Sequence, residues 1–321
     1  MTRRVLVTGA AGFIGSHVSE ALVARGDDVI GVDNFDPFYA RDIKERNLEG
    51  LRRGPRFRLL EADAARDPLP WDGVEVAIHL AARAGVRPSL EDPTAYVTAN
   101  VVATARVLDG ARRAGVRRVV HGSSSSVYGD ATPAPFREDA AAVEPISPYA
   151  ATKRASELLA HVFAQLYRMR IPCLRFFTVY GPRQRPDLAI HGFTDLIARA
   201  QPLRMYGDGS SERDYTYISD AVDGVLAAVE WTARPEPGVC TAINIGGGER
   251  VRLDRLIALI GRTLGQAPDV EHCPDQPGDV RLTAADLRRA EAELGYRPRV
   301  GIEEGIRHFV RWYEATHGRQ S

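Results

Sequence analysis

The stretch that decides the fold reads Thr8-Gly9-Ala10-Ala11-Gly12-Phe13-Ile14-Gly15. It follows a short apolar run that reads as a buried strand, and it opens a helical pattern. In this context Gly9 permits a tight turn, Gly12 lets the backbone approach a pyrophosphate, and Gly15 lets the helix pack close to the sheet. Phe13 and Ile14 open the helix, whose unpaired N–H groups face the phosphates. Glycines alone are ordinary turn residues, but the strand–turn–helix context predicts a dinucleotide-binding loop.

The first half of the chain alternates short apolar runs with helical patterns, which predicts a parallel sheet covered on both faces. Right-handed crossovers make this an α/β fold with a doubly wound parallel Rossmann sheet. The expected strands are 5–8, 29–32, 57–60, 74–80, 116–121 and 172–177, and the expected helices are 14–25, 94–114 and 149–168.

The alternation ends near residue 180, where prolines and glycines separate short elements. Two amphipathic patterns, at 253–264 and 302–313, predict helices in this part. We therefore expect an NAD-binding domain over 1–180, with 215–230 returning to it. A smaller, irregular C-terminal domain over 181–321 would bind the substrate.

A carboxylate at the end of the second strand indicates which dinucleotide is bound. Asp33 is placed to accept from the adenosine ribose hydroxyls and would repel a 2′-phosphate, which favours NAD over NADP. Asp63 follows the third strand, where its side chain could reach the adenine amino group or could equally be a solvated loop acid.

Composition excludes several classes of protein. Lys+Arg and Asp+Glu are both 42 in 321 residues, so no overall basic field favours nucleic acid or an anionic membrane. The three cysteines, Cys173, Cys240 and Cys273, are scattered without CxxC spacing, which argues against a disulfide scaffold and a zinc site. We find no signal segment and no apolar run of the ~20 residues needed to span a membrane. A cytoplasmic protein without a metal is expected.

Tyr149 and Lys153 are four residues apart on an expected helix and so share one face. A lysine ammonium there would stabilise the tyrosinate and lower the phenol pKa toward neutrality. Upstream, Ser123-Ser124-Ser125-Ser126-Val127-Tyr128-Gly129 follows the fifth expected strand. Hydroxyl groups at that end of a parallel strand lie where α/β proteins bind ligands.

With these motifs the sequence resembles the extended short-chain dehydrogenase/reductase superfamily over nearly its whole length. Within it, the sequence is most similar to the NAD-dependent nucleotide-sugar epimerases, in particular the UDP-glucuronate 4-epimerases. The resemblance rests on the segments 33–39, 79–87, 123–129, 147–153, 174–182, 185–188, 213–217 and 276–280.

The resemblance implies specific roles for residues of this chain. Tyr149 would be the acid/base at the sugar C4 hydroxyl, with Lys153 on the nicotinamide ribose and Ser124 sharing the hydroxyl hydrogen bond. Asn34, Ala81, Ala82, Asn100, Phe176 and Phe177 would belong to the NAD pocket. The substrate would contact Arg87, Ser125, Ser126, Thr178, Arg185, Tyr206, Arg213 and Asp279, with Tyr206 beside the uracil, Arg213 on the diphosphate and Asp279 on a ribose hydroxyl.

The implied activity is that of an isomerase. The C4 hydride passes to NAD, the 4-keto sugar turns over in the pocket, and the hydride returns to the opposite face, which converts UDP-glucuronate to UDP-galacturonate. Related dehydratases carry an Asp-Glu pair and decarboxylases a Glu where this chain has Ser125 and Ser126, which favours epimerisation.

Arg185 is the candidate for binding the uronate carboxylate, with Arg183 a nearby competitor and a surface loop arginine as the other interpretation. Arg83 and the Arg183-Gln184 pair depart from the family pattern and leave open UDP-glucose/UDP-galactose or an N-acetylated sugar as substrate. A non-catalytic NAD-binding scaffold is a more distant alternative. The resemblance also implies a homodimer in which the helices 94–114 and 149–168 form a four-helix bundle with their copies.

Overall fold

The computed structural model of the chain describes residues 2–274 and 282–318. Its largest element is a sheet of parallel strands in the spatial order β10-β6-β5-β4-β1-β2-β3. In chain order the strands are β1 (Arg4–Thr8), β2 (Asp28–Asp33), β3 (Phe57–Glu61), β4 (Val76–His79), β5 (Val119–Ser124), β6 (Arg170–Phe176) and β10 (Val239–Ile245). The strand order reverses between β1 and β4, the place where doubly wound sheets bind ligands. The predicted fold class is confirmed.

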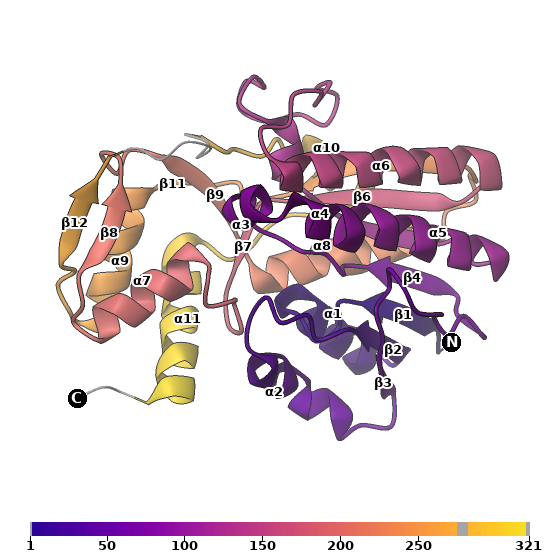
Figure 1. Cartoon of the computed structure of the whole chain (residues 1–321), viewed down its shortest axis with the longest axis horizontal. Helices are drawn as coiled ribbons and strands as arrows, with labels where there is room; N and C mark the ends of the chain where they lie inside the picture. The colour runs from indigo at the N-terminus through magenta and orange to yellow at the C-terminus, as the bar shows by residue number, and fades with distance from the viewer. Residues whose placement is uncertain (1, 275–281, 319–321) are drawn as a thin grey trace.

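Helices cover both faces of this sheet (Figure 1). One face carries α1 (Phe13–Ala24), α2 (Arg41–Arg52) and α8 (Ile218–Trp231), and the other carries α5 (Ala103–Arg113) and α6 (Pro148–Tyr167). Successive side chains of β1 point to opposite faces of the sheet, so both faces need a cover. Val5 and Val7 belong to the core beneath α1, and Leu6 belongs to the core beneath α5. α10 (Arg288–Leu294) packs against α8 and β10.

A second group of elements has its own core and lies to one side of the large sheet (Figure 1). It has a sheet of β7 (Thr178–Tyr180), β9 (Glu212–Tyr217) and β11 (Arg250–Arg252), a pair of β8 (Leu203–Tyr206) and β12 (Val270–Cys273), and the helices α7 (Ala189–Ala198), α9 (Leu253–Leu264) and α11 (Ile302–His317). Tyr180, Leu256 and Phe309 are buried in this core. Across residues 2–274 and 282–318, no helix combines the length and apolar character that a membrane span requires.

The segment 215–230 divides between the two groups. β9 pairs with β7 and β11, whereas α8 packs against α1 and the large sheet. The strand that returns to the large sheet is β10, which pairs with β6 along its full length and was not predicted. α2 was not predicted either, because most of its residues are charged or polar and only Lys44, Asn47, Leu48 and Leu51 are buried on it.

The helix predicted over 94–114 is interrupted. The chain forms α3 (Val86–Glu91), α4 (Pro93–Tyr96), a π-helical segment η1 (Val97–Val102), and then α5. Asp92 caps α4 by accepting from Ala95 N at 3.1 Å. A single regular helix is therefore wrong here, since the wide turn of η1 sets Asn100 into the interior.

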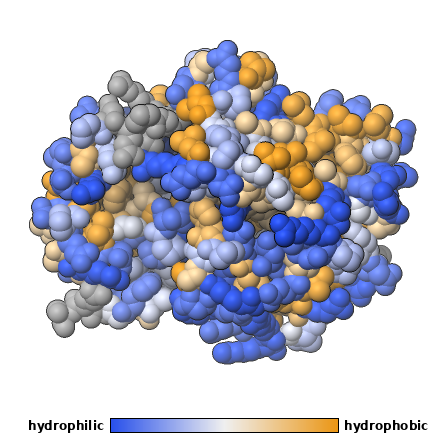
Figure 2. Space-filling view, viewed as in Figure 1, coloured by the Kyte–Doolittle hydropathy of each residue, from blue (hydrophilic) through white to orange (hydrophobic). Residues whose placement is uncertain are grey.

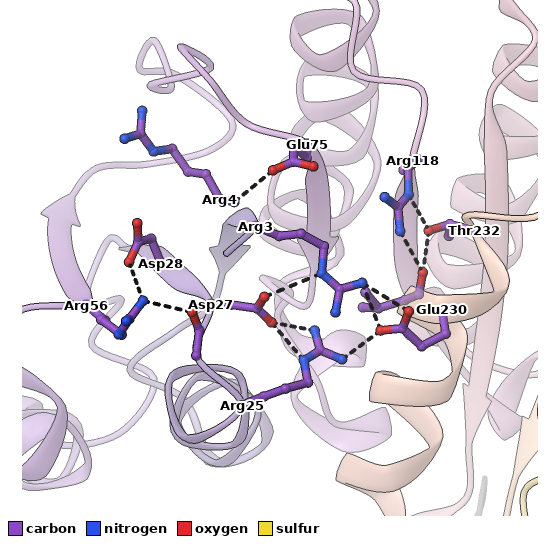
Figure 3. A network of polar contacts seen from close by, with 12 residues as sticks. Arg3, Arg4, Arg25, Asp27, Asp28, Arg56, Glu75, Arg118, Glu230 and Thr232 are labelled. Carbon is purple, nitrogen blue, oxygen red and sulfur yellow. Dashed lines mark hydrogen bonds and ion pairs between the residues drawn. The ribbon is translucent and has the colours of Figure 1, made fainter. Parts of the chain in front are cut away.

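An ion-pair network joins elements at the amino ends of the central strands, opposite the edge where the carboxyl ends lie (Figure 3). Arg3 and Arg25 both pair with Glu230 of α8, at 2.8 and 2.9 Å, and Arg25 also bonds Asp27 at 2.8 Å. The Glu230 side chain is 56% exposed, so each of its pairs contributes at most about 1 kcal/mol. The network orients α1 and α8 relative to β1 without being part of the site.

Candidate active site

A cleft of about 470 Å³ opens at the carboxyl ends of the strands of the large sheet. The last residues of four strands line it: Thr8, Asp33, Ser124 and Phe176. Because strand order reverses between β1 and β4, the loops that follow these strands separate and leave room for a ligand.

The glycine-rich turn forms one wall of the cleft. Gly9 has φ +74°, and a Cβ on it would lie 2.8 Å from Ala81 N. A Cβ on Gly15 would lie 2.0 Å from Gly9 O. Gly12 is the residue before α1, so the first N–H groups of that helix lie at the cleft. Phe13 and Ile14 line the cleft beside them.

Asp33 sits at the end of β2 and is held from several directions. Its carboxylate accepts from Ala11 N at 3.1 Å and from Phe35 N at 2.9 Å, and Lys44 Nζ lies 3.4 Å away. Both charged side chains are buried. Lys44 lines the cleft but was missed in the sequence analysis, because the helix that carries it was not predicted.

The other residues expected at the adenosine end also line the cleft. Asn34 is exposed and accepts from Asp36 N at 3.0 Å. Asp63 accepts from Ala65 N at 2.8 Å. Each side-chain oxygen thus accepts from the N–H two residues later and stabilises a local turn at the edge of the cleft.

Ala81 and Ala82 line the cleft from the loop after β4, whereas Asn100 lies one layer behind it. The Asn100 amide accepts from Arg83 N at 2.8 Å and donates to Arg83 O at 3.1 Å and Thr152 Oγ1 at 2.9 Å. It therefore shapes the loop that forms the wall. Arg83 pairs with Asp36 at 3.2 Å and with Asp92 at 3.7 Å, so its charge is compensated within the loops around the dinucleotide end.

α6 begins in a way that places Tyr149 at the cleft. Ser147 accepts from Ala150 N at 3.1 Å, and Pro148 occupies the first helical position, where its missing N–H costs nothing. Tyr149 is thus in the first turn, half-buried, with its ring edge-on to Tyr96 at 6.2 Å.

Lys153 follows one helical turn later and is buried, with Nζ donating to Gly122 O at 2.9 Å. Burial lowers the pKa of Lys153 to about 8. Burial also raises the pKa of Tyr149, while the Ser124 hydroxyl and the charge of Arg185 lower it. The predicted fall of the phenol pKa toward neutrality is therefore wrong for this geometry, because desolvation outweighs the groups that stabilise the phenolate.

The serine run supplies three hydroxyls to the same space. Ser124, Ser125 and Ser126 all line the cleft, and Ser124 Oγ accepts from Ser126 N at 3.2 Å. This bond caps the short 3₁₀ turn η2 (Ser125–Tyr128) and fixes the direction of the chain after β5.

The far end of the cleft is lined by Phe176, Phe177, Thr178 and Arg185. The Arg185 guanidinium donates from Nε and Nη2 to Asp187 at 2.9 and 2.7 Å, and it lies 5.1 Å from the Phe38 ring. Phe38 and Tyr39 also line the cleft and were missed in the sequence analysis, since no local pattern shows that the loop after β2 folds over the site.

Three described substrate residues expected from the resemblance, Arg87, Tyr206 and Arg213, do not line this cleft. Arg87 lies over the Tyr206 ring at 5.3 Å, which brings α3 and β8 together. Arg213 lies in β9 and donates to Glu212 O at 3.1 Å. Asp279 lies outside the residues that the structure describes.

Comparison with known proteins agrees with this geometry. The NAD dependent epimerase/dehydratase family matches residues 5–246. The UDP-glucuronate 4-epimerase of Thermodesulfobacterium geofontis is 38% identical, over 96% of this chain and 95% of that protein. The crystal structure of UDP-glucuronic acid 4-epimerase from Bacillus cereus with UDP-glucuronic acid and NAD superimposes with a TM-score of 0.92 at 36% identity, covering 98% of this chain and 99% of that one. MoeE5, solved with NAD and either UDP-glucose or UDP-glucuronic acid, is 36% identical with TM-scores of 0.86 and 0.85, over 98% of this chain and 99% of that one.

Proposed function

The chain belongs to the NAD dependent epimerase/dehydratase family, and on that premise we propose that it converts UDP-glucuronate to UDP-galacturonate by inverting C4. The broader activity is that of an NAD-dependent UDP-sugar 4-epimerase, an isomerase. The observation that carries the proposal is one continuous cleft. It joins the glycine turn and Asp33 to Tyr149 and, beyond them, to Arg185.

The described residues fit NAD. The turn at Gly9 and Gly15 leaves no room for a Cβ, and the N-terminus of α1 offers N–H groups to a pyrophosphate. The carboxylate of Asp33 suits ribose hydroxyls and disfavours a 2′-phosphate. When bound, NAD accepts a hydride from C4 of the sugar and returns it.

The chain's own residues handle the proton. Tyr149 takes the proton of the C4 hydroxyl and later gives it back, with Ser124 sharing the hydrogen bond to that oxygen. Lys153, whose ammonium donates to Gly122 O, follows Tyr149 by one helical turn, and its positive charge would offset part of the burial that raises the pKa of Tyr149. Ser125 and Ser126 are not acids or bases of the kind that an elimination would need.

Binding of the nucleotide is assigned to residues of both groups of elements. We assign the uracil to Tyr206, the diphosphate to Arg213 and a ribose hydroxyl to Asp279, with Arg87 contacting the nucleotide sugar from α3. The contact of Arg87 with Tyr206 supports a ligand that bridges these elements. The division into an NAD-binding domain of 1–180 with 215–230 and a sugar-binding domain of 181–321 is part of this proposal, and the pairing of β10 with β6 extends the first domain to 239–245.

Arg185 is the group proposed to hold the uronate carboxylate, together with the hydroxyls of Ser125, Ser126 and Thr178. Its pair with Asp187 uses Nε and Nη2, so Nη1 is the nitrogen that a substrate would approach. The ion pair of Arg185 with Asp187 also favours a second candidate function, that of a UDP-glucose/UDP-galactose 4-epimerase. Asp187 already balances the charge of Arg185, so the site does not need a substrate carboxylate.

The deciding experiment incubates the purified protein with UDP-glucuronate and, separately, with UDP-glucose and an N-acetylated UDP-sugar, and follows the sugar protons by NMR. Conversion of only the uronate to its C4 epimer, without a pentose product, supports the proposal. Conversion of only a neutral sugar overturns the substrate and the role of Arg185. No conversion of any of them would favour the non-catalytic NAD-binding scaffold.

We also propose a homodimer and a cytoplasmic location. Large apolar side chains gather over α6 and the preceding helical segments (Figure 2): Leu90, Val97, Val102, Leu158, Val162, Leu166 and Tyr167 are exposed. A face of this kind on paired helices suits a four-helix bundle with a second copy. The cysteines Cys173, Cys240 and Cys273 are free thiols, which suits a reducing compartment.

A further inference from the structure

A buried carboxylate lies on the same face of α6 as the two residues assigned to proton transfer. Glu157 is four residues after Lys153 and eight after Tyr149, so all three follow one line along the helix. The Glu157 side chain is 4% exposed. A buried carboxylate is costly unless it is paired, so its partners indicate why it is there.

Glu157 has partners on three elements. Arg175 of β6 donates to it from Nε and Nη2, each at 2.8 Å, and is itself buried. Ser123 of β5 donates its hydroxyl at 2.6 Å, and Arg154 of α6 donates at 2.8 Å. These bonds outweigh the effect of burial, which favours the neutral acid, and the pKa of Glu157 is lowered. Glu157 is therefore an anion inside the protein.

These contacts hold the strand that carries the site. Glu157 binds Ser123, Lys153 binds the carbonyl of Gly122, and the next residue along β5 is Ser124. Two residues of α6, one turn apart, thus fix two successive residues of β5. The position of Ser124 relative to Tyr149 depends on both anchors.

The charge of Glu157 also acts on Lys153. The titratable groups that interact with Lys153 are Glu157 of α6, His79 of β4, His121 of β5 and Cys173 of β6, and its ammonium donates to Gly122 O. Burial lowers the pKa of both histidines, so they are neutral near pH 7. Glu157 is the carboxylate of this set, and it counters the burial that draws the proton from Lys153.

We propose that Glu157 is a positioning residue of the site, whose carboxylate keeps Lys153 protonated and holds β5 in register beneath Tyr149. The catalytic consequence rests on the proposed epimerase function. The link between Glu157 and the charge of Lys153 does not, since it concerns only groups of this chain.

The composition of the chain makes the charge of Lys153 directly measurable. Lys44 and Lys153 are the two lysines of the whole sequence. Protein labelled with ¹³C-lysine gives two Cε signals, and a Lys44→Arg variant assigns them. The pH midpoint of the Lys153 signal can then be compared between wild type, Glu157→Gln and Glu157→Asp.

We expect the Lys153 midpoint to fall by about one pH unit in Glu157→Gln, the usual effect of losing one nearby opposite charge, and to stay near the wild-type value in Glu157→Asp. In Glu157→Gln the alkaline limb of the kcat–pH profile should shift to lower pH by the same amount, while KM for the UDP-sugar changes little. In Glu157→Asp, kcat should fall about 10-fold because the shorter side chain holds β5 less firmly. The alkaline limb of the kcat–pH profile should stay where it is in wild type, because the negative charge is kept.

An unmoved Lys153 midpoint in folded Glu157→Gln would overturn the proposal and leave Glu157 a scaffold residue. Glu157→Gln leaves Arg175 buried without its carboxylate, so the double variant Glu157→Gln/Arg175→Gln serves if the single variant does not fold. The Lys153 midpoint of the double variant is then compared with that of Arg175→Gln, so that only the carboxylate differs. A fall between these two variants supports the proposal, and an equal midpoint overturns it. If wild type converts no UDP-sugar, the proposed function fails while the NMR titration still tests the role of Glu157.

Discussion

Arg185 lines the cleft, whereas the guanidinium of Arg183, two positions earlier, is bonded to Glu20 of α1 at 2.8 Å. In the sequence Arg185 is the candidate and Arg183 its nearby competitor, and in the fold the two occupy different environments. Arg183 has φ +67°, and this left-handed turn separates the directions of the two side chains. Arg183 is therefore the natural control for substitutions of Arg185.

Arg185→Ala should lower kcat/KM for UDP-glucuronate about 10- to 100-fold, because hydrogen bonds to a charged group are worth ~1.5–3 kcal/mol. Turnover of a neutral UDP-sugar and binding of UDP should change little. Steady-state kinetics with both sugars and calorimetry with UDP measure this, with Arg183→Ala as the control. Equal loss of UDP affinity would make Arg185 a phosphate ligand instead.

Tyr149→Phe should reduce kcat by a factor of ~10²–10⁴, the usual contribution of general acid–base catalysis. The cofactor should still bind, since Gly9, Gly15 and Asp33 are unchanged. The measurement pairs single-turnover kinetics with the NAD content of the purified variant. Near-wild-type turnover would remove Tyr149 from the mechanism.

Asp33→Asn should weaken NAD binding about 10-fold or more through loss of a charge-assisted hydrogen bond, and it should narrow the preference for NAD over NADP. It also leaves Lys44 buried beside an uncharged group, so some loss of stability is expected. Dissociation constants for both dinucleotides test this. Glu61→Gln is the matched control, because Glu61 ends the neighbouring strand β3 but is exposed and paired with Arg41. Equal effects in the two variants would speak against a direct role for Asp33.

Stability should fall as the pH drops below 6.5. Burial lowers the pKa of His121 to about 3 and that of His17 to about 4, whereas in the unfolded chain both titrate near 6.5. Between about pH 4 and 6.5 the unfolded state therefore binds more protons, and each such group removes up to about 1.4 kcal/mol per pH unit. Urea unfolding at several pH values measures the slope. His17→Gln, which can keep the bond to Pro182 O, should reduce that slope; an unchanged slope would contradict the assignment.

Leu158→Lys combined with Leu166→Lys should give a monomer, because two charges would be buried in the proposed helix bundle. Sedimentation velocity distinguishes the two states. Val143→Lys is the control, since Val143 is 71% exposed and lies outside α6. A wild-type monomer, or a dimer that survives both substitutions, would exclude this interface.

The parts of the fold that the sequence predicts are those that depend on residues close together along the chain. The glycine turn, the carboxylate at the end of the second strand and the helix that carries Tyr149 and Lys153 all follow from periodicity and spacing within about 20 residues. The fifth strand is found three residues later than expected, at 119–124 instead of 116–121, so it includes Ser123 and Ser124. Most of these elements begin and end within a few residues of the expected positions. The NAD-dependent epimerase family and activity that the resemblance implied are confirmed.

The parts that the sequence does not predict depend on contacts between distant segments. Lys44 is part of the site because α2 packs so that its ammonium lies beside Asp33. Glu157 is a buried anion because Arg175 of β6 lies against it. The wide turn at Asn100 allows its bonds to Arg83 and Thr152, and no periodicity in residues 94–114 indicates it. Pairing of this kind is decided by tertiary packing.

The late position of β10 has a consequence for how the chain reaches its native state during synthesis. β6 is buried over all seven of its residues, and one of its two edges is covered by β10, which follows more than 60 residues later. When the ribosome has made only the first 180 residues, that edge presents unpaired backbone N–H and C=O groups, and it can pair with other nascent chains. The sheet is complete only after residues 239–245 have emerged. We therefore expect the yield of folded protein to depend on a chaperone or on rapid translation of residues 181–238.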